Sequence, residues 1–269
     1  MADPGEFELA SEILGPLPVV NHFLDRIGLA EHLDRHLPND DARLRLDPAT
    51  VIGVVVRNLM VSHRPVYALG EWASSYQPAL LGLSGSDPAA LNDDRVGRML
   101  DRLFDSDRAT LITEVVLGVI RDFDLDVSQL HNDSTTVTFS GAHKGATGRA
   151  RGGKATPAIT YGHNKDHRPD LKQLLWILTV SADGAVPIAY RTEDGNTADD
   201  GTHIPTWDEL VALVGRPDFL YVADCKLANR TAMDHIATNG GRFVTVLPRT
   251  RKEDAEFRDR VSAHDPDWT

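Results

Sequence analysis

Apolar residues recur at helical spacing through the first 125 residues. In residues 17–29 they lie three or four positions apart, as one face of an amphipathic helix requires. The run 51–61 is apolar and β-branched and also suits a buried strand, but Asp47-Pro48 before it provides an N-cap and a proline at the first helical position. We therefore predict a buried helix there, with further helices over residues 69–81, 93–103 and 109–123.

The pattern changes near residue 124. Alternating positions predict strands near residues 125–130 and 137–139, with Asp133 in the polar stretch between them. Two apolar runs, 174–180 and 186–190, flank a turn and predict a hairpin. Strands at 219–223 and 242–247 then alternate with helices over 202–214 and 227–238, and the chain turns helical after residue 249. We predict an all-α domain over residues 1–125 and an α/β domain with a mixed sheet over residues 126–269.

Composition narrows the class of protein. The chain has 269 residues, of which 41% are hydrophobic and 25% charged, which is typical of a globular protein and not of a disordered one. A single cysteine, Cys225, excludes a disulfide framework and a cysteine-rich zinc site. No apolar run approaches the length of a membrane span, and the N-terminus lacks a secretory signal. We expect a cytoplasmic protein without a membrane partner.

The net charge of −12 argues against a nucleic-acid partner only if the charge is evenly spread. Residues 1–125 carry a net −9 and residues 126–269 a net −3, but residues 141–172 hold seven bases and two acids. This stretch is rich in glycine, so we predict a mobile loop that approaches a polyanion; a solvated surface loop is the alternative. The candidate DNA-binding residues are Lys144, Arg149, Arg151, Lys154, Lys165 and Arg168.

Two aspartates stand out by their position. Asp133 follows a predicted strand and Asp224 ends another, and strand ends of an α/β sheet are where ligands usually bind. Carboxylates brought together repel each other unless they share a hard cation such as Mg²⁺, and two such ions can support phosphodiester cleavage. The alternative is structural: Asp133 would start a turn and Asp224 would cap the helix that follows it.

Other candidates for chemistry are weaker. His163 and His167 are four residues apart, but they lie in a predicted loop without an obvious third zinc ligand. The thiol of Cys225 follows Asp224, whose negative charge opposes formation of a thiolate. We therefore expect neither a zinc site nor a cysteine nucleophile.

Six short segments together resemble one family. They are residues 15–29, 91–101, 131–137 (His-Asn-Asp-Ser-Thr-Thr-Val), 162–171 (Gly-His-Asn-Lys-Asp-His-Arg-Pro-Asp-Leu), 195–199 (Gly-Asn-Thr-Ala-Asp) and 221–227 (Tyr-Val-Ala-Asp-Cys-Lys-Leu). In this order and spacing the chain resembles the DDE-type transposases of bacterial insertion sequences, in the subgroup with a helical domain before the catalytic core. The resemblance runs from about residue 14 to about residue 250.

The resemblance implies an RNase H-like core with a site for two divalent ions, Mg²⁺ or Mn²⁺. By matching position, Asp133 and Asp224 would be the catalytic metal ligands. The implied activity is hydrolysis at transposon ends followed by strand transfer to target DNA. The implied partner is DNA, bound by a homo-oligomer, and the implied location is the nucleoid.

One part of the family pattern is missing. The family's third acid is a glutamate in a tyrosine–arginine–glutamate–lysine pattern, whereas Glu253 and Glu256 follow the last strand too closely and lack the preceding tyrosine and arginine. We therefore expect a core truncated at its C-terminus, weak or inactive alone, with an apolar sheet face exposed. The alternatives are a non-catalytic DNA-binding or interaction protein derived from a truncated transposase and, more remotely, a metal-dependent phosphodiesterase with another substrate.

Overall fold

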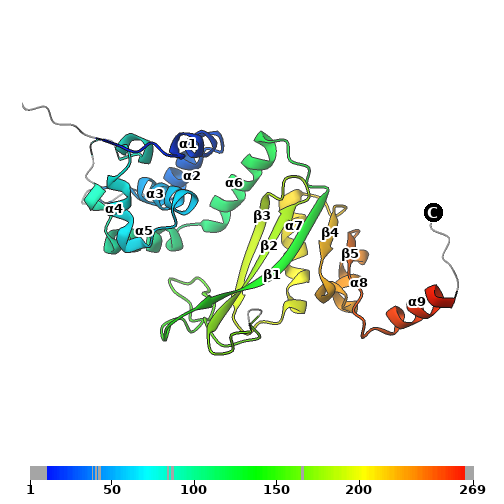
Figure 1. Ribbon diagram of the computed structural model, residues 1–269. Helices are drawn as coiled ribbons and strands as arrows, with labels where there is room; N and C mark the ends of the chain where they lie inside the picture. Colours follow the sequence, from blue (N-terminus) through cyan, green and yellow to red (C-terminus); the bar gives the residue numbers. More distant parts are fainter. Residues whose placement is uncertain are drawn as a thin grey trace, which may run out of the picture. The chain divides into compact units, whose positions relative to one another are not determined.

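The computed structural model describes residues 11–37, 39, 41, 44–83, 85, 88–164 and 167–263. The chain divides into two compact units, unit 1 from Met1 to Phe123 and unit 2 from Asp124 to Thr269 (Figure 1). Unit 1 is helical and unit 2 contains the strands. Each unit has its own core and is described by itself.

Unit 1 consists of α-helices joined by short turns of 3₁₀ helix. The α-helices are α1 (Leu17–Arg26), α2 (Leu29–His36), α3 (Pro48–Val61), α4 (Leu69–Ser74), α5 (Asp93–Asp105) and α6 (Arg108–Asp122); the 3₁₀ turns are η1 (Val66–Ala68), η2 (Pro78–Leu81) and η3 (Pro88–Ala90). The prediction of one helix over residues 69–81 is wrong. Helix α4 ends at Ser74 and Pro78 begins a separate turn, because proline disfavours helical backbone in the residue before it.

Local capping explains where several helices of unit 1 begin. The side chains of Asp47, Asn92 and Asp107 accept hydrogen bonds from backbone N–H groups in the first turns of α3, α5 and α6. The apolar run 51–61 is a buried helix, as predicted, with Val51 and Val54 fully buried. These helices enclose a core that consists mainly of leucine, valine and alanine side chains.

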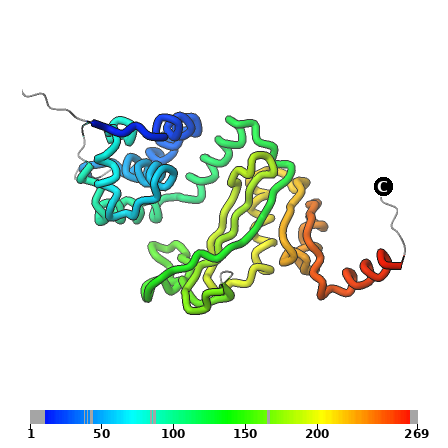
Figure 2. The backbone as a smooth tube through the Cα atoms, in the orientation of Figure 1, coloured from blue at the N-terminus to red at the C-terminus, as the bar shows by residue number. Residues whose placement is uncertain are grey.

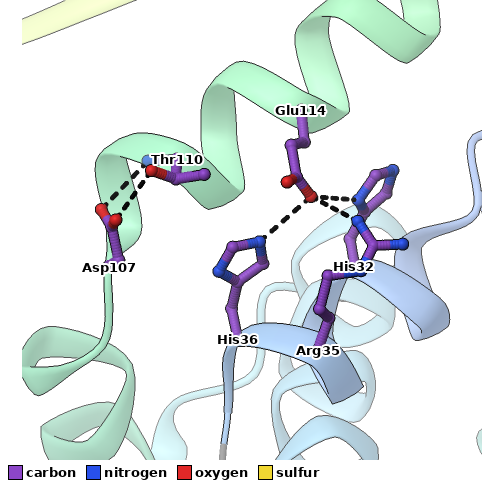
Figure 3. A network of polar contacts seen from close by, with 6 residues as sticks. All are labelled: His32, Arg35, His36, Asp107, Thr110 and Glu114. Atoms are coloured by element: carbon purple, nitrogen blue, oxygen red, sulfur yellow. Dashed lines mark hydrogen bonds and ion pairs between the residues drawn. The ribbon is translucent and has the colours of Figure 1, made fainter.

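Helices α2 and α6 are joined by one carboxylate. Glu114 of α6 accepts hydrogen bonds on its Oε2 from His32 Nδ1 (3.2 Å), Arg35 Nη1 (2.6 Å) and His36 Nε2 (3.1 Å), all on α2 (Figure 3). These bonds hold the pKa of Glu114 below its ordinary value, mainly through the bond from His36, although partial burial opposes the shift. The cluster therefore stabilises the packing of the two helices.

Unit 2 is built on one five-stranded mixed sheet. The strands are β1 (Gln129–Phe139), β2 (Lys172–Ser181), β3 (Pro187–Asp194), β4 (Leu220–Ala223) and β5 (Arg242–Thr245), in the order β3-β2-β1-β4-β5 (Figures 1 and 2). Strands β1 to β3 pair antiparallel, whereas β4 pairs parallel with β1 and β5. Helix α7 (His203–Val214) connects β3 to β4, and α8 (Arg230–Thr238) connects β4 to β5. This confirms the prediction of an α/β fold with a mixed sheet for the second part of the chain.

The first strand differs from the prediction. Residues 129–139 form one continuous strand, and Asp133 lies inside it opposite Leu178 of β2. Asp133 therefore starts no turn. The polar residues of this stretch are compatible with a strand because they find partners across the sheet: buried Asn132 donates from Nδ2 to Thr179 Oγ1 at 2.9 Å.

The two faces of the sheet differ in burial. One face contributes to the core of unit 2 together with residues of α7 and α8; the fully or nearly fully buried members are Leu130, Leu175, Ile177, Ile188, Trp207, Leu210, Tyr221 and Ile236. Residues of opposite alternation are more exposed: Val137 is 41%, Tyr190 39% and Val244 52% exposed. Tyr190 stacks on Trp176 with ring centroids 4.9 Å apart. Several apolar side chains on this face are therefore partly exposed.

The last described element is α9 (Lys252–Ala263), which buries none of its residues. It carries Glu253, paired with Arg251 at 2.9 Å, and Glu256, paired with Lys252 at 3.1 Å. Within the part of the chain that the structure describes, no helix is long and apolar enough to cross a bilayer.

Candidate functional site

A cavity of about 560 Å³ lies beside the end of β4 in unit 2. Four segments that are far apart in the sequence line it, and they are the segments at residues 131–137, 162–171, 195–199 and 221–227 described above. Their lining residues are Thr136, His163, Thr197, Ala198, Asp199, Asp224, Cys225 and Lys226; Gln173, Leu175, Asp200, Ala228 and Asn229 complete the wall. The fold therefore collects these segments around one cavity.

Asp224 follows the last residue of β4 and lines the cavity. Its Oδ1 accepts a hydrogen bond from the backbone N–H of Lys226 at 2.9 Å, which caps the 3₁₀ turn η5 (Cys225–Leu227). Asp224 therefore does act as a cap, which is the structural role considered for it above. The capping bond engages only one of its two carboxylate oxygens. The side chain is exposed, so it remains accessible from the cavity.

Asp133 lies close to Asp224 by register. Asn132 of β1 pairs with Ala223 of β4, so the two aspartates are the next residues on neighbouring parallel strands, which are spaced about 4.8 Å apart. Asp133 is exposed and is not among the described residues that line the cavity. Its Oδ1 accepts from the backbone N–H of Ser134 at 2.7 Å. The pair is therefore adjacent along the sheet, but only Asp224 borders the cavity.

The cavity also holds two carboxylates that the sequence reasoning did not single out, Asp199 and Asp200. They form the start of the turn η4 (Asp199–Gly201), directly before α7. Ser134 Oγ donates to Asp199 Oδ2 at 3.0 Å, which ties this turn to β1 beside Asp133. The sequence does carry a signal for these two residues. Asp199 lies in the segment 195–199 that resembles the family core, and two adjacent acids precede the predicted helix over 202–214.

The carboxylates create a negative environment around His203. Burial lowers the pKa of His203, while Asp224, Asp199 and Asp200 oppose that shift. His203 Nδ1 lies 3.2 Å from the hydroxyl of Tyr221, and burial together with Asp224 raises the pKa of that phenol. Burial therefore favours the neutral form of both His203 and Tyr221.

Close packing of backbone fixes the segments around Gln173, which lines the cavity. A Cβ atom on Gly162 would lie 1.9 Å from the Gly195 carbonyl oxygen, and one on Gly195 would lie 2.0 Å from the Gln173 carbonyl oxygen. Neither distance is possible for a real side chain, so both positions require glycine. Gln173 Nε2 donates to the Gly195 carbonyl at 2.6 Å and completes this contact.

The donor set suits a hard divalent cation. Asp133, Asp224 and Asp199 offer carboxylate oxygens, which are the ligands that Mg²⁺ and Mn²⁺ prefer. Among the described residues, however, no group of three or more His, Cys, Asp or Glu side chains is arranged closely enough to hold a metal ion. The zinc site considered for His163 and His167 is likewise absent from the described part of the chain, and Cys225 is a free, half-buried thiol.

The candidate DNA-binding cations lie between β1 and β2. Lys144, Arg149 and Arg151 are exposed and Lys154 is half-buried. Arg168 forms two hydrogen bonds with Asp170, at 2.8 and 2.7 Å, so its charge is balanced locally. Lys165 lies outside the described residues.

The glycine-rich loop contains a short antiparallel pairing of its own. Thr147 pairs with Ala158 and Arg151 pairs with Lys154 in an antiparallel arrangement. Two glycines, Gly152 and Gly153, form the turn between the paired segments, and their positive φ angles of 56° and 78° are those of a tight hairpin turn. The glycines that suggested mobility therefore make a turn.

One protein family matches part of the chain. Residues 9–117 match the family described as "Domain of unknown function (DUF4277)". No curated protein matches the chain significantly.

Among solved structures, the chain is similar to a piggyBac transposase in a synaptic complex with hairpin DNA, with 14% identity and a TM-score of 0.43 over 96% of this chain. The chain spans 55% of the length of that protein. It is also similar to the Mos1 transposase in a paired-end complex with the left transposon end, with 11% identity and a TM-score of 0.26 over 86% of this chain and 75% of that one.

Proposed function

We propose that this protein is a DNA transposase of the DDE type, which hydrolyses phosphodiester bonds at the ends of an insertion sequence and transfers strands. The observation that carries the proposal is the cavity beside β4, because the four core segments that resemble this family all contribute to its wall. If the resemblance were accidental, the four segments would not be expected to meet at one cavity. Association with the nucleoid and assembly into a homo-oligomer on DNA belong to the same proposal.

In this proposal Asp133 and Asp224 hold Mg²⁺ or Mn²⁺, and Asp199 is a further carboxylate that is linked to the same strand through Ser134. The cations would supply activation of water and neutralisation of the charge that develops on the phosphate. The chain's own contribution is to bring the carboxylates to one end of the sheet and to hold Asp224 by its bond to the Lys226 N–H. The cations at residues 144–154 would contact the DNA backbone.

The test is nicking of supercoiled plasmid DNA by the full chain in Mg²⁺ or Mn²⁺. Asp133→Asn and Asp224→Asn should each lower the nicking rate at least about 100-fold, since loss of an outer-shell partner alone typically costs 10–100-fold. Asp234→Asn, an exposed carboxylate on α8, is the matched control and should leave the rate unchanged. Equal nicking by the three variants would remove both aspartates from the mechanism.

The second candidate is a DNA-binding or interaction protein without catalytic activity. It is favoured by the lack, among the described residues, of a third side chain close enough to complete a metal site. In that case the unmodified chain binds duplex DNA without nicking it, and binding survives Asp133→Ala and Asp224→Ala. Nicking that depends on both aspartates would decide against this candidate.

A further inference from the structure

The segment between β1 and β2 contains a small two-stranded ribbon. Thr147–Ala158 and Arg151–Lys154 are antiparallel pairs that follow the same register, and Thr156 Oγ1 donates to the Arg149 carbonyl at 2.7 Å between them. The turn at its tip is closed by two hydrogen bonds, Arg151 N–H to Lys154 O at 2.9 Å and Lys154 N–H to Arg151 O at 3.0 Å. In Figure 2 the green backbone after β1 forms a loop before it enters β2.

The register gathers cations on one side of the ribbon. Directly paired residues of antiparallel strands point to the same side, and residues two positions apart along a strand do so too. Arg149, Arg151 and Lys154 therefore share one side, whereas the neighbours on the other side, Ala150 and Ala155, are small. No acidic residue occurs between residues 140 and 164. The ribbon is thus thin, and one side is strongly positive.

The base of the ribbon is anchored to the wall of the candidate site. Ile159 donates its N–H to the Ala146 carbonyl at 3.0 Å, and Ala158 donates to Asp194 Oδ1 at 2.7 Å. Gly195 N–H then donates to the Ala158 carbonyl at 3.1 Å. Because Gly195 packs directly on Gln173, which lines the cavity, a ligand held by the ribbon lies next to the segments that form the site.

We propose that this ribbon, residues 147–158, enters the major groove of duplex DNA with Arg149, Arg151 and Lys154 against the phosphates and base edges. The major groove, about 12 Å wide, admits a two-stranded ribbon without deformation of the duplex, whereas the minor groove, about 6 Å wide, has to be widened to do so. The glycine turn keeps the tip narrow, and arginine is suited to guanine and phosphate. The inference rests on the proposed function for its DNA partner, and it specifies how that DNA is held.

The first test measures the affinity of the full chain for a mixed-sequence duplex as a function of salt. Each phosphate contact contributes about 1 to the slope of log affinity against log salt. Replacing Arg149, Arg151 and Lys154 by alanine should lower that slope by about 2 to 3. Replacing Arg216, Arg258 and Arg260 by alanine removes the same charge from exposed positions outside the ribbon and should not lower it in this way. An equal change in both triple variants would overturn the proposal.

The second test separates the shape of the ribbon from its charge. Gly152→Val with Gly153→Val keeps every cation but places β-branched residues at positive φ, which strains the turn. Dimethyl sulfate methylates guanine N7 in the major groove, and we expect the unmodified chain to protect it. This protection should be lost in the valine variant and in the ribbon triple variant. Protection confined to the minor groove would contradict the proposed mode of binding.

The outcomes of these tests distinguish a failure of the ribbon proposal from a failure of the proposed function on which it rests. If the unmodified chain binds no DNA, both proposals fail. If nicking depends on Asp133 and Asp224 while the ribbon variants leave the salt slope unchanged, only the ribbon proposal fails. If the slope falls but nicking is independent of the aspartates, the ribbon stands and the catalytic assignment fails. Loss of self-association without loss of DNA binding in the ribbon variants would assign the ribbon to contact with a second copy of the chain instead.

Discussion

In unit 1, the ionised carboxylate of Glu114 makes the packing of two helices depend on pH. Three donors on α2 share a single oxygen of this carboxylate on α6 (Figure 3). Because the pKa of Glu114 is lowered in the folded protein, its stabilisation is present above the pKa of the unfolded chain and is lost as pH falls through the folded value. The contribution is therefore complete at neutral pH and disappears on the acid side.

Glu114→Gln should lower the melting temperature of the chain at pH 7, and the difference from the unmodified protein should shrink as the pH is brought below 4. Thermal unfolding followed by circular dichroism across this range measures both effects. Glu71→Gln removes the same charge from an exposed site on α4 and serves as the control. A pH-independent difference would show that the ionised carboxylate is not the stabilising group.

At the scale of elements, the start of α8 holds the cavity wall in place. Asn229 accepts a hydrogen bond from the Ala232 N–H at 2.8 Å and donates from Nδ2 to the Lys226 carbonyl at 3.1 Å. The same side chain lines the cavity beside Asp224. The N-cap thus connects the helix to the turn that follows β4.

Asn229→Ala should cost about 1 kcal/mol of stability, the usual effect of removing an N-cap. Asn229→Ser keeps a capping oxygen and should recover most of this loss. Urea unfolding monitored by tryptophan fluorescence provides the measurement, since Trp207 is buried in α7 of the same unit. If serine is no better than alanine, the cap does not account for the effect.

At the scale of the whole molecule, the chain has two separate cores. Met99 is buried in unit 1, and Leu210 of α7 is fully buried in unit 2. Cavity-forming substitutions at such positions typically cost about 2 to 5 kcal/mol. If each unit has its own stability, the loss should be confined to the unit that carries the substitution.

Leu210→Ala should therefore accelerate amide hydrogen exchange in the strands of unit 2 and leave the helices of unit 1 unchanged. Met99→Ala should give the reverse pattern, so the two variants act as controls for each other. Hydrogen exchange resolved by peptide mass spectrometry gives the readout. Accelerated exchange throughout the chain in either variant would show that the units unfold together.

Local patterns along the chain predict most of the helices and strands correctly. Caps at Asp47 and Asn92, the two hairpin strands and the helices between the later strands depend on neighbouring residues, and periodicity and capping report such local preferences. The prediction from sequence was wrong where residues far apart in the chain determine the local conformation. The polar stretch around Asp133 is a strand because β2 and β4 pair with it on both sides, which no local pattern reveals.

Which side chains meet at the site depends on the tertiary fold. The tertiary fold brings Asp199 and Asp200 to the cavity with Asp224, leaves Asp133 outside the described lining residues, and pairs Arg168 with Asp170. It also converted a glycine-rich stretch into a ribbon with its cations on one side. The physical reason is the same in each case: strand register and close backbone packing fix which side chains meet, and both depend on residues far apart in the chain.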